Sequence, residues 1–409
     1  MIEIKEGRMY IDGINPERLA DEYGTPLYIY DADTIRTRFR QLRQSLTIPN
    51  TRIYYAAKAN SNIAILRIFR DEGAYINAVS PGEIFLAMEA GFNSNQIMFT
   101  GDNLPVEDMR YAINKGVLVN LDSLSQLVTY SKLNPAAPIS LRINPGIEAG
   151  FHDHVITAGP RSKFGIDPVE LKKAQEIANT AQLEIIGLHM HIGSGILHSD
   201  PLLKAAETLL NLAKGFEDLK FINFGGGLGI PYKSNEKPIN VETYCQSLVE
   251  RFVYWTEKYG KQLILAIEPG KFLVAESGVL LTRVTAIKAK GHKKLIGVDT
   301  GFNHLLRPAL YNAYHEIIPV NKTRTSPEWT ADIVGYICEN SDFLARDRPF
   351  SAVNEGDLLA VMNVGAYGFS MASNYNSRLL PAEVLISNRK IRLIRRRQAL
   401  EDLLRDQQG

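Results

Sequence analysis

A lysine closes a stretch of the sequence that otherwise reads as a buried strand. Residues 52–61 are RIYYAAKANS, so that Lys58 directly follows an apolar and aromatic run. The simplest interpretation is a lysine at a strand end that reaches solvent. The alternative is an amine held in a pocket, where it could form a Schiff base with a carbonyl compound. Other residues with chemical potential must decide between the two.

Two glycine-rich stretches further along the chain could bind a phosphate group. HIGSG (191–195) offers backbone amides and the Ser194 hydroxyl, and GGGLG (225–229) offers the amides of Gly225, Gly226, Gly227 and Gly229. Backbone amides in such turns can approach a phosphate closely. Each stretch alone is as well explained by a tight turn. Two of them at neighbouring strand ends favour a phosphate site.

Two histidines and a glutamate also follow apolar runs. His189 and His191, in HMH, would share one face of a strand, because side chains alternate there. One ring could stack on a planar cofactor, and the other could be a core histidine. Zinc would need a third ligand, and HDH at 152–154 lies in a loop bounded by glycine and proline, so we expect no metal. Glu268 ends LILAI and could keep a ring nitrogen protonated. This set is what pyridoxal 5'-phosphate (PLP) chemistry requires.

The runs that carry these residues alternate with amphipathic, helix-like segments from about residue 34 to 270. There are eight runs: RIYYAA, AYINAVS, QIMFT, VLVNLDS, ISLRINP, IIGLHMHIG, FINFGGG and LILAIEPG. Strands that alternate with helices predict a parallel sheet, and eight of them favour a closed (β/α)8 TIM-type barrel over an open doubly wound sheet. Active sites in such barrels lie at the carboxyl ends of the strands, where Lys58, Arg142, Asn144 and Glu268 fall.

The helical pattern fades after about residue 271. GVLLTRVTAIKAK, KLIGVD, TADIVGYICE, DLLAVMNVG, AEVLISN and KIRLIRR are β-rich segments with turn residues between them. They predict a separate all-β domain that is sandwich- or barrel-like. The first strands lie outside the barrel pattern and could join it. We expect a PLP-binding barrel over 32–270 and a β-rich domain formed by 1–31 and 271–409.

Composition narrows the class of protein. The chain has 409 residues, 45% of them hydrophobic and 22% charged, and a net charge of +1. These values are ordinary for a globular protein and give no basic field for nucleic acid. The two cysteines, Cys245 and Cys338, offer neither a disulfide framework nor a metal cluster. We expect a cytoplasmic protein without a signal peptide or membrane span.

Longer motifs identify a family. YYAAKAN, HMHIGSG, GGGLGIPY, EPGKFLVAESG, RPALYNAYH, CENSDFLARDR and GAYGFSMASNYNSR occur in this order and are spread over most of the chain. In this set and order the chain resembles PLP-dependent decarboxylases built on an alanine-racemase-type barrel, and within them the diaminopimelate decarboxylase family. The last four motifs are the more specific. Racemases lack them, and ornithine and arginine decarboxylases share only parts of the set.

The resemblance implies a role for each matching residue. Lys58 would bind PLP through its amine, His191 would stack on the ring and Glu268 would pair with the ring nitrogen. Phosphate contacts would come from Ser194, Gly227, Gly270 and Tyr367. The substrate would be bound by Lys271, Arg307, Tyr311, Glu339 and Tyr367, and Cys338 would be the catalytic proton donor. Since Cys338 and Glu339 come from the neighbouring subunit in this family, a homodimer with shared active sites is implied.

The reaction that the resemblance implies is decarboxylation of meso-2,6-diaminopimelate to L-lysine and CO2, the last step of lysine biosynthesis. An arginine such as Arg307 can bind the distal carboxylate in a bidentate manner, and Glu339 can take the distal ammonium. Ornithine has no distal carboxylate and would leave Arg307 without a partner. Taken singly, Arg307, Cys338 and Tyr367 could each be ordinary surface or core residues.

Two departures from the family pattern leave alternatives open. Lys271 replaces the arginine of EPGR, which keeps the charge but loses the forked geometry. Asn77 stands where relatives commonly carry an acid. A decarboxylase of another basic amino acid or polyamine precursor is therefore the alternative activity. A catalytically silent relative that regulates a partner enzyme is a further alternative, although such a protein should have lost Lys58 or Cys338.

Overall fold

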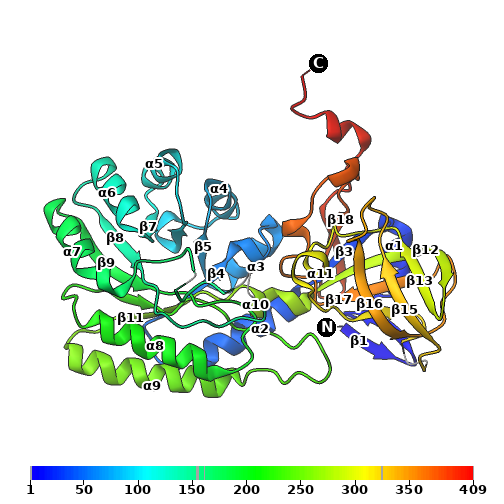
Figure 1. Cartoon of the computed structure of the whole chain (residues 1–409), viewed down its shortest axis with the longest axis horizontal. Coiled ribbons are helices and arrows are strands. Elements are labelled where there is room, and N and C mark those ends of the chain that lie inside the picture. Colours follow the sequence, from blue (N-terminus) through cyan, green and yellow to red (C-terminus); the bar gives the residue numbers. More distant parts are fainter. Residues whose placement is uncertain (1, 153–155, 161, 324–325, 409) are drawn as a thin grey trace. The chain divides into compact units, whose positions relative to one another are not determined.

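Two units make up the chain. The computed structural model describes residues 2–152, 156–160, 162–323 and 326–408. One unit, here the barrel unit, comprises Arg38–Pro231 and Lys237–Leu273, and the other, the β-rich unit, comprises Met1–Thr37, Tyr232–Glu236 and Val274–Gly409. Figure 1 labels many of their helices and strands.

The barrel unit contains eight parallel strands that close in the order β10-β11-β4-β5-β6-β7-β8-β9. The strands are β4 (Thr51–Ala56), β5 (Tyr75–Ala78), β6 (Ile97–Thr100), β7 (Leu118–Leu121), β8 (Pro138–Arg142), β9 (Glu184–His189), β10 (Phe221–Asn223) and β11 (Ile264–Ile267). Each arises from one of the eight apolar runs. The closed (β/α)8 barrel is thereby confirmed, and the open doubly wound sheet is wrong.

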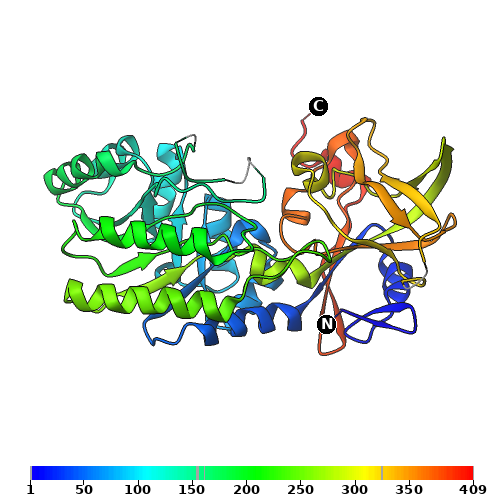
Figure 2. The same ribbon diagram turned by 60° about the horizontal axis from the view of Figure 1, so that its bottom comes forward.

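Helices connect the strands and lie around the outside of the barrel (Figure 1). They are α2 (Ala32–Ser45), α3 (Ile63–Asp71), α4 (Pro81–Glu89), α5 (Val106–Asn114), α6 (Leu124–Leu133), α7 (Leu171–Thr180), α8 (Ser199–Ala213) and α9 (Val241–Tyr259), followed by the short α10 (Lys271–Val274). Two of these helices begin at an N-cap residue whose side chain accepts a backbone hydrogen bond. Ser80 accepts from the Glu83 N–H at the start of α4, and Asn240 accepts from the Thr243 N–H at the start of α9. α8 and α9 lie side by side in both views (Figure 1 and Figure 2).

The barrel interior has an apolar layer followed by a polar one. Tyr54, Met98, Phe221 and Ala266 form a buried hydrophobic cluster. Two residues further along three of these strands, on the same face, come Thr100, Asn223 and Glu268. The polar layer therefore lies toward the carboxyl ends of the strands, where barrel enzymes place their chemistry.

The β-rich unit is built on a mixed nine-stranded sheet with the order β16-β15-β13-β12-β3-β18-β19, in which β17 pairs with β12 and β14. Its strands are β3 (Leu27–Asp31), β12 (Gly278–Lys290), β13 (Lys293–Val298), β14 (Ile317–Pro319), β15 (Trp329–Val334), β16 (Phe343–Phe350), β17 (Leu358–Met362), β18 (Ala382–Ser387) and β19 (Lys390–Arg395). The N-terminal strand β3 joins this sheet, as expected, between β12 and β18. A separate hairpin is formed by β1 (Ile2–Lys5) and β2 (Arg8–Ile11).

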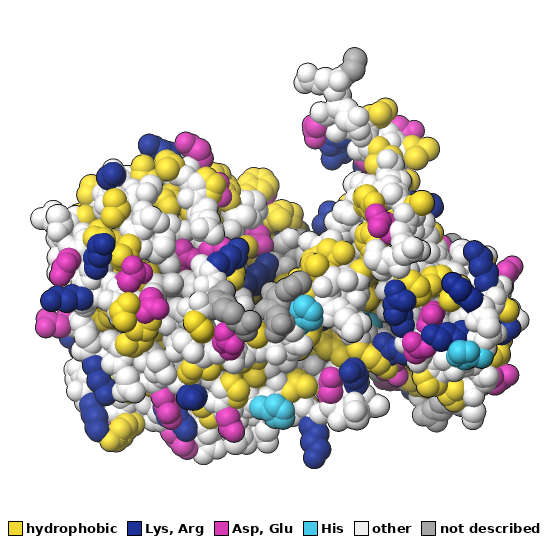
Figure 3. Space-filling model, in the orientation of Figure 1, with side chains coloured by type: hydrophobic (Ala, Val, Ile, Leu, Met, Phe, Trp, Pro, Cys, Tyr) yellow, Lys and Arg dark blue, Asp and Glu magenta, His cyan; other side chains and the backbone are white. Residues whose placement is uncertain are grey.

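The β-rich unit also contains α1 (Pro16–Tyr23) and α11 (Arg307–Tyr311). Its core is aliphatic and joins the hairpin to the sheet, with members such as Met9, Ile29, Leu281 and Val384. On the surface seen in Figure 3, basic and acidic side chains are interspersed, in keeping with the net charge of +1. Within the described ranges, none of the helices is both long and apolar enough for a bilayer crossing.

Candidate active site

Lys58 is carried by a short turn at the carboxyl end of β4. The turn is the 3-10 helix η1 (Ala57–Ala59), in which both alanines are buried and Lys58 is exposed. Although the residue is exposed, desolvation by the surrounding protein lowers the pKa of its amine, and the charge of Arg142 lowers that pKa further. A lower pKa increases the share of unprotonated amine, the form that attacks a carbonyl. The setting therefore suits a reactive lysine better than a plain surface lysine.

Glu268 follows β11 directly and is held by three donors. The Nδ2 atoms of Asn77 and Asn223 donate to its Oε1 at 2.6 and 2.8 Å, and His189 Nε2 lies 2.9 Å from its Oε2. The residue is 8% exposed. Since an ionised carboxylate only accepts hydrogen bonds, His189 Nε2 is the ring nitrogen that carries the proton.

These donors decide the charge of Glu268. Burial alone would raise the pKa of its carboxyl group, but the interactions with His189, Asn77 and Asn223 outweigh burial and bring the pKa below its ordinary value. Burial also lowers the pKa of His189, which favours the neutral imidazole. We assign the pair as a glutamate anion and a neutral ring that donates through Nε2–H.

His191 lies in the loop after β9, and the expectation that both histidines share a strand face is wrong. The strand ends at His189 because the chain turns there into the glycine-rich HIGSG segment. The Gly226 N–H donates to His191 Nδ1 at 3.3 Å, which fixes the ring. Desolvation lowers the pKa of His191 well below its usual value, and the charges of Lys58 and Arg142 act in the same direction. The ring is therefore neutral.

The two glycine-rich loops lie against each other. Ile196 N–H donates to the Gly227 carbonyl, and Gly229 N–H donates to the Ile196 carbonyl, both at 2.9 Å. Gly227 has a φ of +104°, a conformation that favours glycine. A Cβ atom at Gly225 would lie 2.1 Å from the Met190 carbonyl oxygen. Close backbone approach therefore requires glycine here, and it leaves a cradle of backbone groups with the half-buried Ser194 hydroxyl beside it.

Gly270 and Lys271 follow Glu268 at the start of α10. A Cβ atom at Gly270 would lie 3.2 Å from alanine Cβ atoms on both sides of Lys58. Lys271 is only 4% exposed, and its Nζ lies 4.1 Å from the centre of the Phe151 ring. This cation–π contact stabilises the ammonium group in a site from which bulk water is largely excluded. Lys271 is thus a buried cation of the barrel unit.

Arg307 begins α11 in the β-rich unit and is 2% exposed. Its Nη1 lies 2.8 Å from His315 Nε2, and its guanidinium lies 4.7 Å from the centre of the Tyr232 ring. His315 Nδ1 is 2.8 Å from the Met362 carbonyl oxygen, so Nδ1 donates there and Nε2 accepts from the arginine. Arg307 is therefore a positioned, buried guanidinium, and the interpretation as a surface arginine is wrong.

Cys338 and Glu339 lie in an exposed loop between β15 and β16. The Cys338 N–H donates to Asn376 Oδ1 at 2.9 Å, and the Tyr375 hydroxyl donates to Glu339 Oε1 at 2.5 Å. Tyr375 and Asn376, from the GAYGFSMASNYNSR motif, therefore hold this loop by hydrogen bonds. The other thiol, Cys245, is buried, and burial raises its pKa to about 12. Of the two cysteines, Cys338 is the accessible one.

Tyr311 and Tyr367 are both half-buried residues of the β-rich unit. Tyr311 ends α11, one residue before Asn312 turns the chain with a φ of +49°. Tyr367 has a φ of +58°, which is rare for a bulky side chain. Such backbone strain persists where the surroundings fix it and is common at functional sites.

The expected site residues are divided between the two units. The barrel unit carries Lys58, His191, Ser194, Gly227, Glu268, Gly270 and Lys271, and the β-rich unit carries Arg307, Tyr311, Cys338, Glu339 and Tyr367. Among the residues that the structure describes, no group of three or more His, Cys, Asp or Glu side chains is placed to hold a metal ion. Asp153 and His154 of the HDH stretch lie outside the described residues.

Sequence reasoning did not assign the polar residues that support Glu268. Asn223 was not singled out, and Asn77 was noted only as a departure. Thr100 accepts from Asn77 at 3.0 Å and from Asn120 at 3.4 Å, which extends the network to β6 and β7. A usable signal existed, because a single asparagine interrupts each of the apolar runs YINAV, LVNL and FINF. A buried polar side chain in such a run requires a partner.

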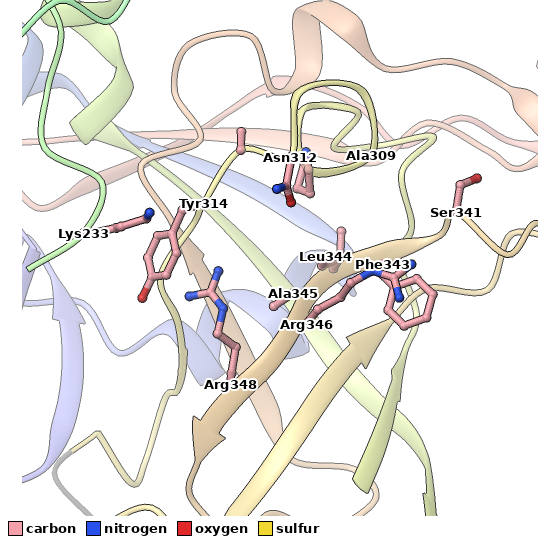
Figure 4. A pocket seen from close by; sticks show the side chains of 12 residues that line it. Lys233, Ala309, Asn312, Tyr314, Ser341, Phe343, Leu344, Ala345, Arg346 and Arg348 are labelled. Atoms are coloured by element: carbon pink, nitrogen blue, oxygen red, sulfur yellow. The ribbon is translucent and has the colours of Figure 1, made fainter. Parts of the chain in front are cut away.

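One cavity of the β-rich unit, of about 360 Å³, lies beside α11 and β16. Figure 4 shows Arg346 and Arg348 on the same strand, with Lys233 and Tyr314 nearby. The Arg348 guanidinium stacks on Tyr314, with Cζ 3.5 Å from the ring centre. None of the expected site residues lines this cavity, so it adds nothing to the assignment of the site.

Comparisons with known proteins agree with the geometry of the barrel unit. Residues 32–275 match the family model described as "Pyridoxal-dependent decarboxylase, pyridoxal binding domain". The diaminopimelate decarboxylase of Methanothermobacter thermautotrophicus is 43% identical, with 99% of this chain and 97% of that protein covered.

Solved structures give the same result. The diaminopimelate decarboxylase of M. jannaschii in complex with L-lysine has a TM-score of 0.92 and 33% identity, with 100% of this chain and 98% of that chain covered. The enzyme of Helicobacter pylori with L-lysine has a TM-score of 0.88 and 36% identity, with 96% of this chain and 98% of that chain covered.

Proposed function

The chain belongs to the diaminopimelate decarboxylase family of PLP-dependent decarboxylases, and from this premise we propose that it converts meso-2,6-diaminopimelate to L-lysine and CO2. Relatives that carry this name align with nearly the whole chain. The similar structures hold L-lysine, which would be the product of this reaction. Lysine biosynthesis is the corresponding biological role.

The barrel unit has residues that fit PLP. Lys58 supplies an amine of lowered pKa, and the loops around Gly227 supply a backbone cradle suited to a phosphate. The observation that carries the proposal is the buried, ionised Glu268, since a fixed anion is what keeps a ring nitrogen protonated. When bound, PLP supplies the electron sink for decarboxylation. The neutral His191 ring suits stacking on it.

The substrate residues follow from the two amino acid ends of diaminopimelate. One end must react while the other is recognised. Arg307 would bind the distal carboxylate with its fork, Glu339 would take the distal ammonium, and Tyr311, Tyr367 and Lys271 would complete the binding site. Arg307 is already buried and fixed in position, which reduces the conformational entropy that its side chain would lose when substrate binds.

A homodimer with shared active sites completes the proposal. Cys338 would donate a proton during the reaction, yet Cys338 and Glu339 are exposed. Closing a site against bulk water strengthens the interactions within it, and a second copy of the chain would close this one. In this proposal the β-rich segments 1–31 and 271–409 complete the site and the dimer interface, and 32–270 binds PLP. We place the enzyme in the cytoplasm, where its unpaired cysteines would stay reduced.

The test is CO2 release by the purified protein with PLP, offered meso-diaminopimelate, ornithine, arginine and lysine. We expect release from diaminopimelate and its loss in Lys58→Ala. Preference for another amine would contradict the substrate assignment and would point to Lys271 as the altered determinant. No release from any of the four would contradict the proposed activity.

Shared sites are tested by mixing two inactive variants. Lys58→Ala and Cys338→Ala protomers are unfolded, refolded together and assayed. If each site uses both subunits, half of the dimers carry one intact site, and activity should recover to about one quarter of that of wild type. Absence of recovery, with dimers present, would contradict the shared site.

A further inference from the structure

The described residues leave one hydrogen-bonding position of the Glu268 carboxylate unoccupied. A carboxylate offers about four lone-pair positions, two on each oxygen. Asn77 and Asn223 occupy the two at Oε1, and His189 occupies one at Oε2. Among the contacts of the described residues, the fourth position, on Oε2, is available for another donor.

Asn223 and Asn77 are oriented by further contacts. Asn223 Oδ1 accepts the Gly225 N–H at 2.9 Å, so its amide nitrogen must face Glu268. Asn77, which is 3% exposed, donates from Nδ2 both to Glu268 and to Thr100 Oγ1. The network thus links Glu268 to the glycine-rich loop on one side and to β6 on the other.

The neutrality of Asn77 matters because it is 2.6 Å from Glu268. An amide brings a donor without a second negative charge. A carboxyl group at the same place would share one proton with Glu268, because two carboxyl groups this close cannot both ionise freely. A hydrogen bond from a neutral donor stabilises a buried anion.

We propose that Asn77 is a positioning residue that keeps Glu268 fully ionised, so that the remaining Oε2 position accepts the ring N–H of PLP. The inference rests on the proposed function for the identity of the cofactor and is independent of the substrate. Asn77 contacts neither cofactor nor substrate in this proposal; it acts through Glu268.

Two substitutions test this by opposite pH trends in PLP affinity. In Asn77→Leu, Glu268 loses a donor and its pKa rises, so the affinity for PLP should fall about tenfold between pH 8 and pH 6. In Asn77→Asp, a protonated aspartic acid replaces the amide donor at low pH. Its ionisation as the pH rises puts a second charge beside Glu268, so the affinity should fall toward pH 8.

The matched controls are Asn120→Leu and Asn120→Asp. Asn120 is buried in the same layer and donates to the same Thr100 oxygen, but it does not contact Glu268. Dissociation constants for PLP come from absorbance titrations of the full-length protein, and circular dichroism at each pH checks folding. If Asn77→Leu does not fold, the comparison of Asn77→Asp with Asn120→Asp still tests the proposal.

The outcomes separate this inference from the proposed function. Opposite pH trends in the Asn77 variants, absent from the Asn120 variants, would support it. Asn77 variants that follow the Asn120 variants would overturn it. A wild-type protein that binds no PLP would overturn both the cofactor and this inference, whereas PLP binding without decarboxylation of diaminopimelate would overturn only the substrate assignment.

Discussion

The barrel unit and the β-rich unit hold the proposed site residues in different ways. In the barrel unit, Glu268 and His191 are fixed by hydrogen bonds among strand ends and loops of the same unit. In the β-rich unit, Arg307 is equally well fixed, but Cys338 and Glu339 stand exposed on a loop. In the proposed site, the cofactor residues are organised within one unit, whereas the exposed Cys338 and Glu339 need a second surface to enclose them.

The largest effect should come from the exposed loop of the β-rich unit. Cys338→Ala should lower the rate of diaminopimelate decarboxylation by roughly a thousandfold, since a positioned proton donor contributes on this scale. Affinity for PLP should stay unchanged, because the barrel unit binds it. The measurement is kcat together with a PLP titration.

Cys245→Ala is the matched control, because it removes the other thiol of the chain. Iodoacetamide at pH 8 should leave Cys245 intact, since burial raises the pKa of Cys245 to about 12. Equal loss of activity in both variants would contradict a specific role for Cys338. Loss of PLP from Cys338→Ala would contradict the assignment of PLP binding to the barrel unit alone.

A smaller effect is expected at the fixed arginine of the β-rich unit. Arg307→Lys keeps the charge but removes the fork, so kcat/KM for diaminopimelate should fall roughly a hundredfold, mainly through KM. Arg348→Lys is the control, because Arg348 also packs on a tyrosine, at 3.5 Å from the Tyr314 ring centre. If the two substitutions raise KM equally, Arg307 does not have a special role in substrate binding.

In the barrel unit, the backbone at Gly226 lies close to the backbone of Glu268. A methyl group added at Gly226 would disturb this packing without removing a polar group. A Cβ atom at Gly226 would lie 2.2 Å from the Glu268 carbonyl oxygen. Gly226→Ala should therefore lower the free energy of unfolding by about 2–3 kcal/mol and weaken PLP binding. Gly260→Ala meets nothing within 4 Å and should cost only about 1 kcal/mol, from its positive φ. Thermal unfolding with and without PLP measures both, and equal shifts would contradict the packing argument.

The fold was more predictable than the site. Each barrel strand could be found because both faces of a parallel strand are buried, which leaves a continuous apolar run. Lys58 and Glu268 could be placed because they end such runs. The β-rich unit was predictable as a class, but the pairing of β3 with β12 and β18 was not, because strand order depends on long-range contacts that leave no local pattern.

The support of Glu268 was the part of the site that sequence alone left open. Asn77, Asn223 and His189 come from three different strands, and only the closure of the barrel brings them to one carboxylate. An isolated asparagine in an apolar run signals that a partner must exist but not which one. The exposure of Cys338 was equally unforeseen, since free cysteines are more often buried.

The smallest expected effect tests how the β-rich unit responds to acid. His304 is buried, accepts at Nδ1 from the Thr300 hydroxyl at 3.0 Å and donates from Nε2 to the Leu379 carbonyl at 3.1 Å. Burial lowers its pKa to about 4. The unfolded chain, with a histidine pKa of about 6.5, binds more protons between these values, so stability should fall as the pH drops from 6.5 toward 4.

By this linkage, the free energy of unfolding should fall by about 1–2 kcal/mol between pH 7 and pH 5 through His304 alone. His304→Gln should be less stable than wild type at pH 7 but should lose less on acidification. His292→Gln, which removes a histidine at an exposed position of the same unit, is the matched control. Denaturant unfolding at the two pH values compares the variants. Equal pH dependence in all three proteins would contradict the assignment of this acid sensitivity to the buried His304 of the β-rich unit.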